Sequence, residues 1–514
     1  MLRKLAIAIL ITLTVPLKST SSELQFQRFR DEIENLTVSY FETGEEACLD
    51  SAVRMLDQMK RANIIRLCRM QLSQTDDIGW SAVASKSVSQ LCPDTVISVE
   101  EVQRDCIKTK QAVLDFMVTQ DRLYTYIITN DTIDAVVHDV ARDTLAAYIS
   151  RLISPLFTAG NPLELTFDHH LALELYQHLI APLYRNINFL QSLIIIPDDI
   201  LMALPFESLV TDSVDLSPSK DILYKEYEQL SYMINKYALA YNFSLSTLGQ
   251  DIKRVKRQKE LGRKLLTMSH TNLLPELADK YNASVPPYGA DETSRVSLLL
   301  WRHNNLTSDG ATREYFIDQC SRYRWIYFAI PVIFRNEAPD SSVMLFSPSN
   351  SAATDDGQLF ISDLLNCNIL SDLMTLSGCQ LSNYGQNNNA GLIPLPQALL
   401  LAGARSLLIN LWRVDDITVS RFMAKYYWEL KYKRQTNSIA LKEAKVTSMK
   451  GTFKYNDREI SRAHPYFWAP YILIGNANVR PPTFSTVPPK MVILIIYVIV
   501  SIYAFYMIRR TKKS

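Results

Sequence analysis

Apolar residues follow two different spacings along the chain, and the change between them separates its regions. Residues 23–108 are predicted to be helical, because ACLDSAVRMLDQMKRANIIRLCRMQL places its apolar positions three and four residues apart. From Gln111 the spacing shortens, and AVLDFMVTQDRLYTYIITNDTIDAVVH predicts two strands around the polar turn TQD and a third strand after ITND. Helical spacing returns in Val140–Leu156 and in HHLALELYQHLIAPLYRNI.

Short apolar runs alternate with helical segments through the rest of the chain. The runs are predicted strands and comprise SLIII, YALAYNF, KLLTMS, WIYFAIPV, DLMTLSGC, SLLINLW and APYILIG. The helical segments are TREYFIDQCSR, LPQALLLAG, VSRFMAKYYWELK and SIALKEAKV. This alternation predicts an α/β fold with a mostly parallel sheet and helices on both faces. Ligands bind beyond the carboxyl ends of strands in such sheets, so strand-ending residues are the first candidates for function.

The first segment of the chain has the character of a secretory signal peptide. Residues 1–22 read MLRKLAIAILITLTVPLKSTSS, in which a basic pair precedes an apolar run and small polar residues follow it. The run is short for a helix that must cross a hydrocarbon core of about 30 Å. A buried N-terminal helix is the alternative interpretation.

A second apolar segment lies near the C-terminus and is long enough to cross a membrane. Residues 491–508 contain no charge, Gly or Pro, which is about the minimum span for a transmembrane helix. The basic residues of 509–514 follow, and basic residues stay on the cytoplasmic side. We therefore expect a single-pass membrane protein with an exoplasmic body (periplasmic, luminal or extracellular) and a cytoplasmic tail. Residues 479–490, VRPPTFSTVPPK, predict a proline-rich stalk, and a buried core helix is the alternative for 491–508.

The composition of the chain argues against several classes of function. With 514 residues, 47% apolar and 21% charged, the chain is typical of a folded protein of several domains. Its net charge of +1 gives no support to nucleic-acid binding. Neither GxxxxGK[ST] nor GxGxxG occurs, and the cysteine and histidine spacing fits no zinc pattern. No cofactor and no metal ion are therefore expected.

Four cysteines cluster in the N-terminal region. They are Cys48, Cys68, Cys92 and Cys106. In an oxidising compartment they could form two disulfides, with three connectivities open. Free buried cysteines are the alternative, and the sequence does not decide between the two.

Six blocks of the sequence, in this order, resemble the CHAT domain, a caspase-like fold of the cysteine peptidase clan that contains caspases and separases. The blocks are VLDFMVTQDRLYTYIIT, LIIIPDDILMALPFESLV, YMINKYALAYNFSLSTL, LMTLSGCQLSNYG, LPQALLLAGARSLLINLWRVDD and HPYFWAPYILIG. The resemblance covers roughly Lys110–Asn476. It implies a caspase-fold domain over residues 109–478, preceded by the helical region 23–108 and followed by one transmembrane helix.

The resemblance also implies where a catalytic cysteine would stand. LMTLSGC is similar to the family's "Leu-Ser-x-Cys" strand, which puts Cys379 at the nucleophile position and Gly378 beside it as a backbone group that can approach a reacting carbonyl. A thiol of pKa about 8.5 is mostly protonated at neutral pH, so its reactivity needs a nearby histidine or positive dipole. A cysteine at a strand end is otherwise a packing residue.

The family's histidine is missing from this chain. RWIYFAIPVIFRNEAPDSSVML is similar to the block "Ala-Thr-His-Gly … Ser-x-Leu", and the alignment puts Pro331 in place of the histidine. Proline has no titratable group and no backbone N–H. Among the seven histidines, His270 directly follows the apolar run LLTMS and is the best substitute, ahead of His303 and His464. For His464, which precedes a proline, a structural role is favoured.

An acidic pair follows the predicted strand SLLINLW. Asp415 and Asp416 would lie near the same sheet edge, and in the clan that the chain resembles an acidic pocket residue can select a basic peptide side chain. The alternative is that the pair caps the helix that begins at Ile417.

Together these features predict a membrane-tethered pseudo-peptidase that binds a protein or peptide partner. The alternative is an active cysteine endopeptidase that uses Cys379 with an unrecognised base. In a third interpretation, residues 23–108 carry the function and the caspase-like domain is a scaffold.

Overall fold

The computed structural model of the chain describes a defined set of residues. These are 19–72, 97–249, 265–269, 273–299, 303–335, 342–348, 357–365, 367–382, 394–414, 418–480, 496–498 and 501. Most of the predicted signal peptide and most of the predicted membrane span lie outside this set. Within it, no helix combines the length and the apolar character that a bilayer crossing requires.

An eleven-stranded sheet forms the centre of the described structure. From one edge to the other its strands are β3 (Ile133–His138), β2 (Leu123–Ile128), β1 (Gln111–Val118), β4 (Ser192–Ile196), β6 (Ala238–Tyr241), β18 (Tyr471–Gly475), β15 (Ser406–Asn410), β13 (Leu373–Leu376), β9 (Trp325–Ala329), β7 (Leu265–Ser269) and β8 (His303–Thr307). Pairing is antiparallel in β3–β2–β1 and between β18 and β15, and parallel elsewhere. The predicted mostly parallel sheet is therefore confirmed.

The strands form where the sequence offers fully buried apolar runs. Every residue of β1 is buried, as are the last four residues of β4. The polar turn after β1 and the one after β2 produce the antiparallel meander that AVLDFMVTQDRLYTYIITNDTIDAVVH predicts. β1 then pairs in parallel with β4, which joins the meander to the rest of the sheet.

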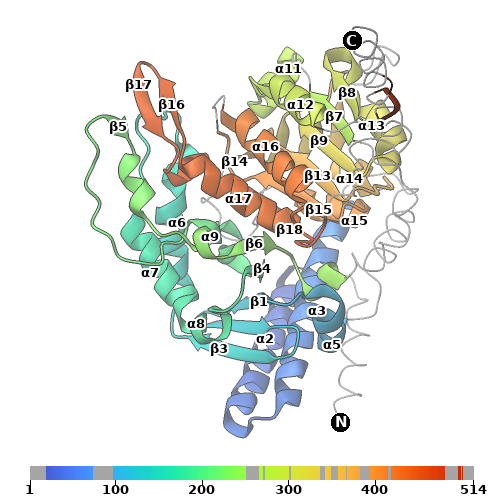
Figure 1. Ribbon diagram of the computed structural model, residues 1–514. Helices are drawn as coiled ribbons and strands as arrows, with labels where there is room; N and C mark the ends of the chain where they lie inside the picture. The colour runs from blue at the N-terminus through green and yellow to red at the C-terminus, as the bar shows by residue number, and fades with distance from the viewer. Residues whose placement is uncertain are drawn as a thin grey trace, which may run out of the picture.

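The α-helices fill the segments with helical spacing. Their bounds are α2 (Ser19–Thr43), α3 (Glu46–Leu72), α5 (Val99–Glu101), α6 (Arg142–Thr158), α7 (His169–Leu179), α8 (Tyr184–Ile187), α9 (Met233–Lys236), α11 (Pro275–Tyr281), α12 (Gly289–Leu298), α13 (Arg313–Gln319), α14 (Ile361–Leu365), α15 (Pro394–Ala402), α16 (Thr418–Trp428) and α17 (Asn437–Met449). In Figure 1, α16 and α17 cross in front of the strands, and the blue pair α2 and α3 lies behind the meander.

Two smaller sheets lie outside the central one. The first contains β12 (Gln358–Phe360), β11 (Val343–Leu345), β10 (Val332–Arg335) and β14 (Cys379–Ser382), in that order. The second contains β16 (Thr452–Tyr455), β17 (Arg458–Ser461) and β5 (Ile222–Leu223). The first sheet matters for the site, because β10 continues from β9 and β14 continues from β13.

The helices α2 and α3 form an antiparallel pair that shares the core of the sheet. The chain reverses at Gly44, whose positive φ of 72° suits glycine and whose N–H bonds the carbonyl of Tyr40. Apolar residues of both helices, including Ile33 and Leu56, belong to the same buried cluster as β1 and β4. The cysteine-bearing helices therefore pack as part of one core with the sheet.

Buried polar contacts reinforce this packing. Lys60 Nζ on α3 lies 2.6 Å from Asp115 Oδ1 on β1, and it also donates to the carbonyl oxygen of Ile196 at 3.1 Å. Asp57, one helical turn earlier, accepts a 2.8 Å hydrogen bond from the backbone N–H of Ser246. Since a buried charge is tolerated only when it is paired, the sheet depends on α3 for its charge balance near Asp115.

The cysteines of the N-terminal region do not form the pair of disulfides that an oxidising compartment would allow. Cys48 is a free thiol, and each of the three connectivities requires it to be bonded. Cys48 points from the first turn of α3, where it is half-buried. Cys106 is buried at the end of the π-helix that follows α5, and the side chains of Cys68 and Cys92 lie outside the described residues.

Candidate functional site

The two strands that the sequence singled out are neighbours in the sheet. β9 and β13 pair in parallel, with Phe328 opposite Leu376. Beyond their carboxyl ends the chains stay together, because the Ser377 N–H bonds the carbonyl of Phe328 at 2.9 Å and the Val332 N–H bonds that of Gly378 at 3.0 Å. Val332 then pairs with Cys379 in the small sheet. Pro331 and Cys379 therefore stand on adjacent segments at one edge of the central sheet.

The thiol of Cys379 is directed into the protein. The residue is 1% exposed, and its Sγ donates a 3.1 Å hydrogen bond to the carbonyl oxygen of Leu376. Burial raises the pKa of this thiol to about 12, against the opposing effect of the Asn410 backbone N–H. The thiol is consequently protonated at neutral pH and has the environment of a packing cysteine.

Gly378 permits a close approach of two backbones. A Cβ at this position would lie 2.1 Å from the carbonyl oxygen of Ile330 and 3.0 Å from the ring of Pro286. Only glycine leaves room for this contact. The glycine of the motif thus holds the turn after β13 against the segment between β9 and Pro331.

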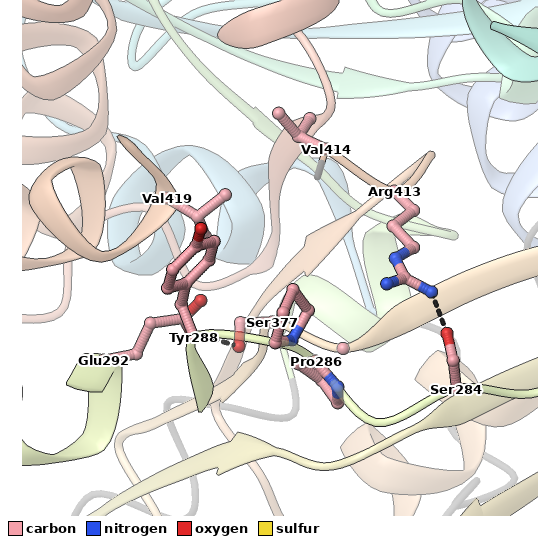
Figure 2. Close-up of a pocket in the computed structure, with 10 residues that line it drawn as sticks. Ser284, Pro286, Tyr288, Glu292, Ser377, Arg413, Val414 and Val419 are labelled. Carbon is pink, nitrogen blue, oxygen red and sulfur yellow. Dashed lines mark hydrogen bonds between the residues drawn. The ribbon is translucent and has the colours of Figure 1, made fainter. Parts of the chain in front are cut away.

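A pocket opens beside this turn, beyond the carboxyl ends of β13 and β15. Its volume is about 410 Å³ with its open mouth included. It is lined by Ser284, Pro286, Pro287, Tyr288, Glu292, Ser377, Gly378, Arg413, Val414 and Val419. Figure 2 shows these side chains around the hollow, with Glu292 and Arg413 on opposite sides of it. Of the residues that the structure describes, neither Cys379 nor any histidine lines this pocket.

Glu292 is the buried acidic group of the pocket. It lies in the first turns of α12 and is 3% exposed. Its Oε2 accepts two hydrogen bonds, one of 2.6 Å from Ser377 Oγ and one of 2.8 Å from the Tyr327 hydroxyl. Burial raises the pKa of Glu292 to about 6, although the two hydroxyl donors act in the opposite direction. At neutral pH the pocket therefore contains a negative charge held by hydroxyl groups.

The partners of Glu292 differ from those of four other buried acids in the described structure. Each of the four has a cation within ion-pair distance: Asp115 with Lys60, Asp198 with Arg30, Glu207 with Lys445, and Asp372 with Arg405. Glu292 has no such pair among the described ion pairs. A buried carboxylate without a cation, at the wall of a pocket, is a candidate site for a cationic ligand.

Arg413 supplies the positive charge on the opposite wall. Its guanidinium donates to the hydroxyl of Ser284, which closes one side of the pocket (Figure 2). Val414 is the next residue and also lines the pocket. Asp415 and Asp416 follow directly but lie outside the described residues, as does Ile417, and α16 begins at Thr418.

The histidines considered as substitutes have different positions. His464 is fully buried among Tyr224, Tyr227 and Phe167, and its Nδ1 accepts a hydrogen bond from the backbone N–H of Tyr466 at 3.2 Å. Burial lowers its pKa to about 3, so the structural role favoured for it is confirmed. His303 begins β8 at the edge of the sheet. His270 lies outside the described residues, directly after Ser269, which pairs with Ala329.

The sequence singled out the sheet edge at which the pocket lies, and Gly378 within it, but not Glu292, Ser377 or Arg413. Ser377 lies inside the quoted block LMTLSGC, yet no rule of sequence reading singles out its hydroxyl. Glu292 lies in GADETSR, where an acidic residue in a first helical turn is a common stabilising feature. Among the described residues, no group of three or more His, Cys, Asp or Glu side chains is arranged to hold a metal ion.

Comparisons with known proteins place this geometry in a family. Residues 169–476 match the family described as "CHAT domain". Two structures of the Saccharomyces cerevisiae separase–securin complex, at 3.0 and 2.6 Å resolution, are similar at 9% identity with TM-scores of 0.47 and 0.43. Each covers 84% of this chain, which spans only 34% of the matched chain. A structure titled "Structure of Protease" is similar at 11% identity and a TM-score of 0.33, covering 73% of this chain and 80% of its own. No match was found among curated proteins.

Proposed function

The chain belongs to the CHAT domain family, and we propose that it is a membrane-tethered pseudo-peptidase that binds a protein or peptide without cutting it. The observation that carries this proposal is the state of Cys379. Its thiol is buried, protonated and bonded to Leu376, and it does not face the pocket. Attack on a peptide carbonyl requires a thiolate at a surface that the substrate can reach.

The position of Pro331 supports the same conclusion. It is buried on the segment beside the cysteine, where the family resemblance calls for a histidine. General acid–base assistance is worth about 10²–10⁴ in rate, and a proline supplies none. The alternative, an active endopeptidase, requires another base beside Cys379 and an outward turn of the thiol. His270 remains the residue to test for that role.

An electrophilic peptide probe tests the proposal directly. Purified full-length protein is incubated with the probe at neutral pH, and modification at Cys379 is measured by mass spectrometry. We expect no labelling at Cys379 in the folded protein, and labelling only after denaturation. Labelling of the folded wild type that is lost in Cys379→Ser and in His270→Ala would establish the peptidase alternative instead.

For the bound partner, we propose a segment with a basic side chain. The resemblance assigns this recognition to Asp415 and Asp416, which directly follow the pocket residue Val414. The carboxylate of Glu292 gives independent support, because it lies in the pocket wall and forms no ion pair with any of the described residues. Glu292, on the wall opposite Arg413 (Figure 2), would accept a lysine or arginine side chain, and the peptide bond would stay intact.

The membrane placement is part of the proposal. Its support is the order of residues in 1–22 and the uncharged run 491–508 followed by a basic tail. The body would then be exoplasmic and held on the proline-rich stalk 479–490. Protease treatment of sealed vesicles tests this: the body should be digested from the exoplasmic side only, and digestion from the cytoplasmic side would reverse the proposed orientation.

The third interpretation, in which residues 23–108 carry the function, cannot be tested by deleting this region. Deletion of this region would remove Lys60 and leave Asp115 buried without its cation. Loss of binding would then report misfolding. Surface substitutions on α2, such as Phe41→Ser at a half-exposed position, separate a binding role from this packing role.

A further inference from the structure

Two cysteines outside the pocket lie against each other. Cys320 begins the short 3-10 helix Cys320–Arg322 that leads into β9, and Cys367 precedes β13. Their thiols hydrogen-bond to each other. The Cys320 sulfur also lies 4.0 Å from the carbonyl oxygen of Asn368, the residue that follows Cys367. Two independent contacts therefore place these cysteines side by side, although they are 47 positions apart in the sequence.

We propose that Cys320 and Cys367 form a disulfide bond when the protein meets a disulfide oxidant. The pair is reduced in the described structure. Thiols in mutual hydrogen-bond contact need only a small displacement to reach the bonding distance of about 2.05 Å. Disulfide formation in the purified protein depends only on this contact between the two thiols. Its occurrence in the cell depends also on the proposed exoplasmic placement, because exoplasmic compartments are oxidising.

The two cysteines have different access to an oxidant. Cys367 is half-buried, whereas Cys320 is 2% exposed. The hydrogen bond between the two thiols lowers the pKa of Cys320 and raises the pKa of Cys367, so Cys320 is the better nucleophile for the second exchange, whereas exposure decides the first. Cys367 is accordingly the residue that meets the oxidant, and Cys320 is the one that completes the bond.

The reaction balances as two thiol–disulfide exchanges. Cys367 loses its proton to water, and its sulfur attacks one sulfur of a small-molecule disulfide, such as oxidised glutathione. A mixed disulfide forms, and the departing thiolate takes a proton from water. Cys320 loses its proton to water and attacks the Cys367 sulfur of this mixed disulfide. The protein disulfide forms and the second small thiol leaves. Two protein thiols are oxidised, and one oxidant disulfide is reduced to two thiols.

The disulfide would join the segments that precede β9 and β13, the two strands that lead to the candidate site. β9 leads to Pro331, and β13 leads to Ser377 and Cys379. Both cysteines precede their strands, so the disulfide lies at the amino ends, at the edge opposite the pocket. It would close the loop 320–367 and restrict the unfolded chain, which stabilises the folded state.

Peptide mapping of the full-length protein tests the proposal. Detergent-solubilised protein is equilibrated with reduced or oxidised glutathione, quenched with acid, alkylated and cleaved before aspartate. Cys320 then lies in fragment 318–339 and Cys367 in 363–371, apart from Cys379. We expect the two fragments to be linked after oxidation and separate after reduction. The oxidised protein should also have the higher Tm.

Variants supply the controls. Cys379→Ser and Cys48→Ser should keep the linked fragments, whereas Cys367→Ser should lose both the link and the redox dependence of Tm. Alkylation of both cysteines in oxidised wild-type protein would overturn the proposal, and so would a link from either cysteine to a different one. Because the linked fragments are sought in the wild type, the result does not depend on the folding of a variant.

A second measurement separates this proposal from the proposed placement. Cells are lysed into alkylating reagent, and the redox state of the pair is read from the same fragments. A pair that oxidises in the purified protein but is found reduced in cells would contradict the exoplasmic placement and leave the disulfide chemistry intact. Failure of the purified protein to oxidise would reject the disulfide itself.

Discussion

The hydroxyl of Ser377 donates a 2.6 Å hydrogen bond to the carboxylate of Glu292, which joins the turn after β13 to the first part of α12. Cys379, two residues further along, turns its sulfur inward to Leu376. The polar group that this turn presents to the pocket is therefore the hydroxyl of Ser377, which is hydrogen-bonded to the buried carboxylate of Glu292. The predictions below begin from this pair.

Glu292 should bind cations in a pH-dependent manner. Its pKa of about 6 means that the carboxylate is mostly protonated at pH 5 and ionised at pH 7.5. Affinity for N-acetyl-arginine amide, measured by calorimetry on the full-length protein, should rise across this interval. In Glu292→Gln the affinity should be lower at pH 7.5 and independent of pH. A wild-type affinity that does not change between pH 5 and 7.5 would contradict this role.

The same group should make stability depend on pH. The folded-state pKa of Glu292 is raised from its ordinary 4.5 to about 6, so its contribution is fully present below pH 4.5 and is lost as pH rises through 6. The shift corresponds to about 2 kcal/mol. Chemical denaturation of wild type and Glu292→Gln at pH 4.5 and 7.5 measures it: the variant should gain about this much relative to the wild type at the higher pH. An equal difference at both values would exclude a titration of Glu292.

Substitution of Gly378 should be costly. The methyl group of Gly378→Ala would meet the carbonyl oxygen of Ile330 at 2.1 Å, and the backbone must shift to admit it. We expect a loss of about 3 kcal/mol in unfolding free energy. Gly160→Ala is the matched control, because no atom lies within 4 Å of its added Cβ. Its effect should stay within about 0.5 kcal/mol. Similar values for the two variants would show that the close approach is not maintained in solution.

Loss of Lys60 should destabilise the protein more than loss of a surface lysine. Lys60→Met leaves Asp115 buried without its cation, at a cost of about 3–5 kcal/mol. Lys225→Met breaks the more exposed pair with Glu228 and should cost at most about 1 kcal/mol. The double variant Lys60→Met with Asp115→Leu should recover much of the loss. If it remained as unstable as Lys60→Met, packing of the lysine stem would be the main contribution.

The sequence predicted the structure correctly where a local pattern of apolar and polar residues favours one type of secondary structure. The apolar run AVLDFMV favours a strand that is buried on both faces, and the two polar turns after it predict the antiparallel meander. The neighbouring positions of β9 and β13 were also foreseeable, since the blocks that carry Pro331 and Cys379 resemble adjacent strands of one family.

Side-chain direction and long-range pairing were not accessible in the same way. Whether the thiol of Cys379 faces a pocket or the core depends on how the turn after β13 packs against Ile330, a contact between distant segments. The cysteines that meet are Cys320 and Cys367, whereas closeness in sequence had drawn attention to the N-terminal four. Glu292 carries no motif, and its character comes from burial beside Tyr327 and Ser377.

The C-terminal end of the described domain has a mechanical consequence. The carbonyl of Val479 accepts a hydrogen bond from the N–H of Asn437 at the start of α17, and β18 just before it forms five residue pairs with β15. A tension applied to the chain beyond residue 480 would first load the start of α17, through Asn437. It would then act along β18, whose pairs with β15 resist shear together. A load on this end of the domain would therefore pass through β18 into the centre of the sheet, where β15 leads to the pocket residues Arg413 and Val414.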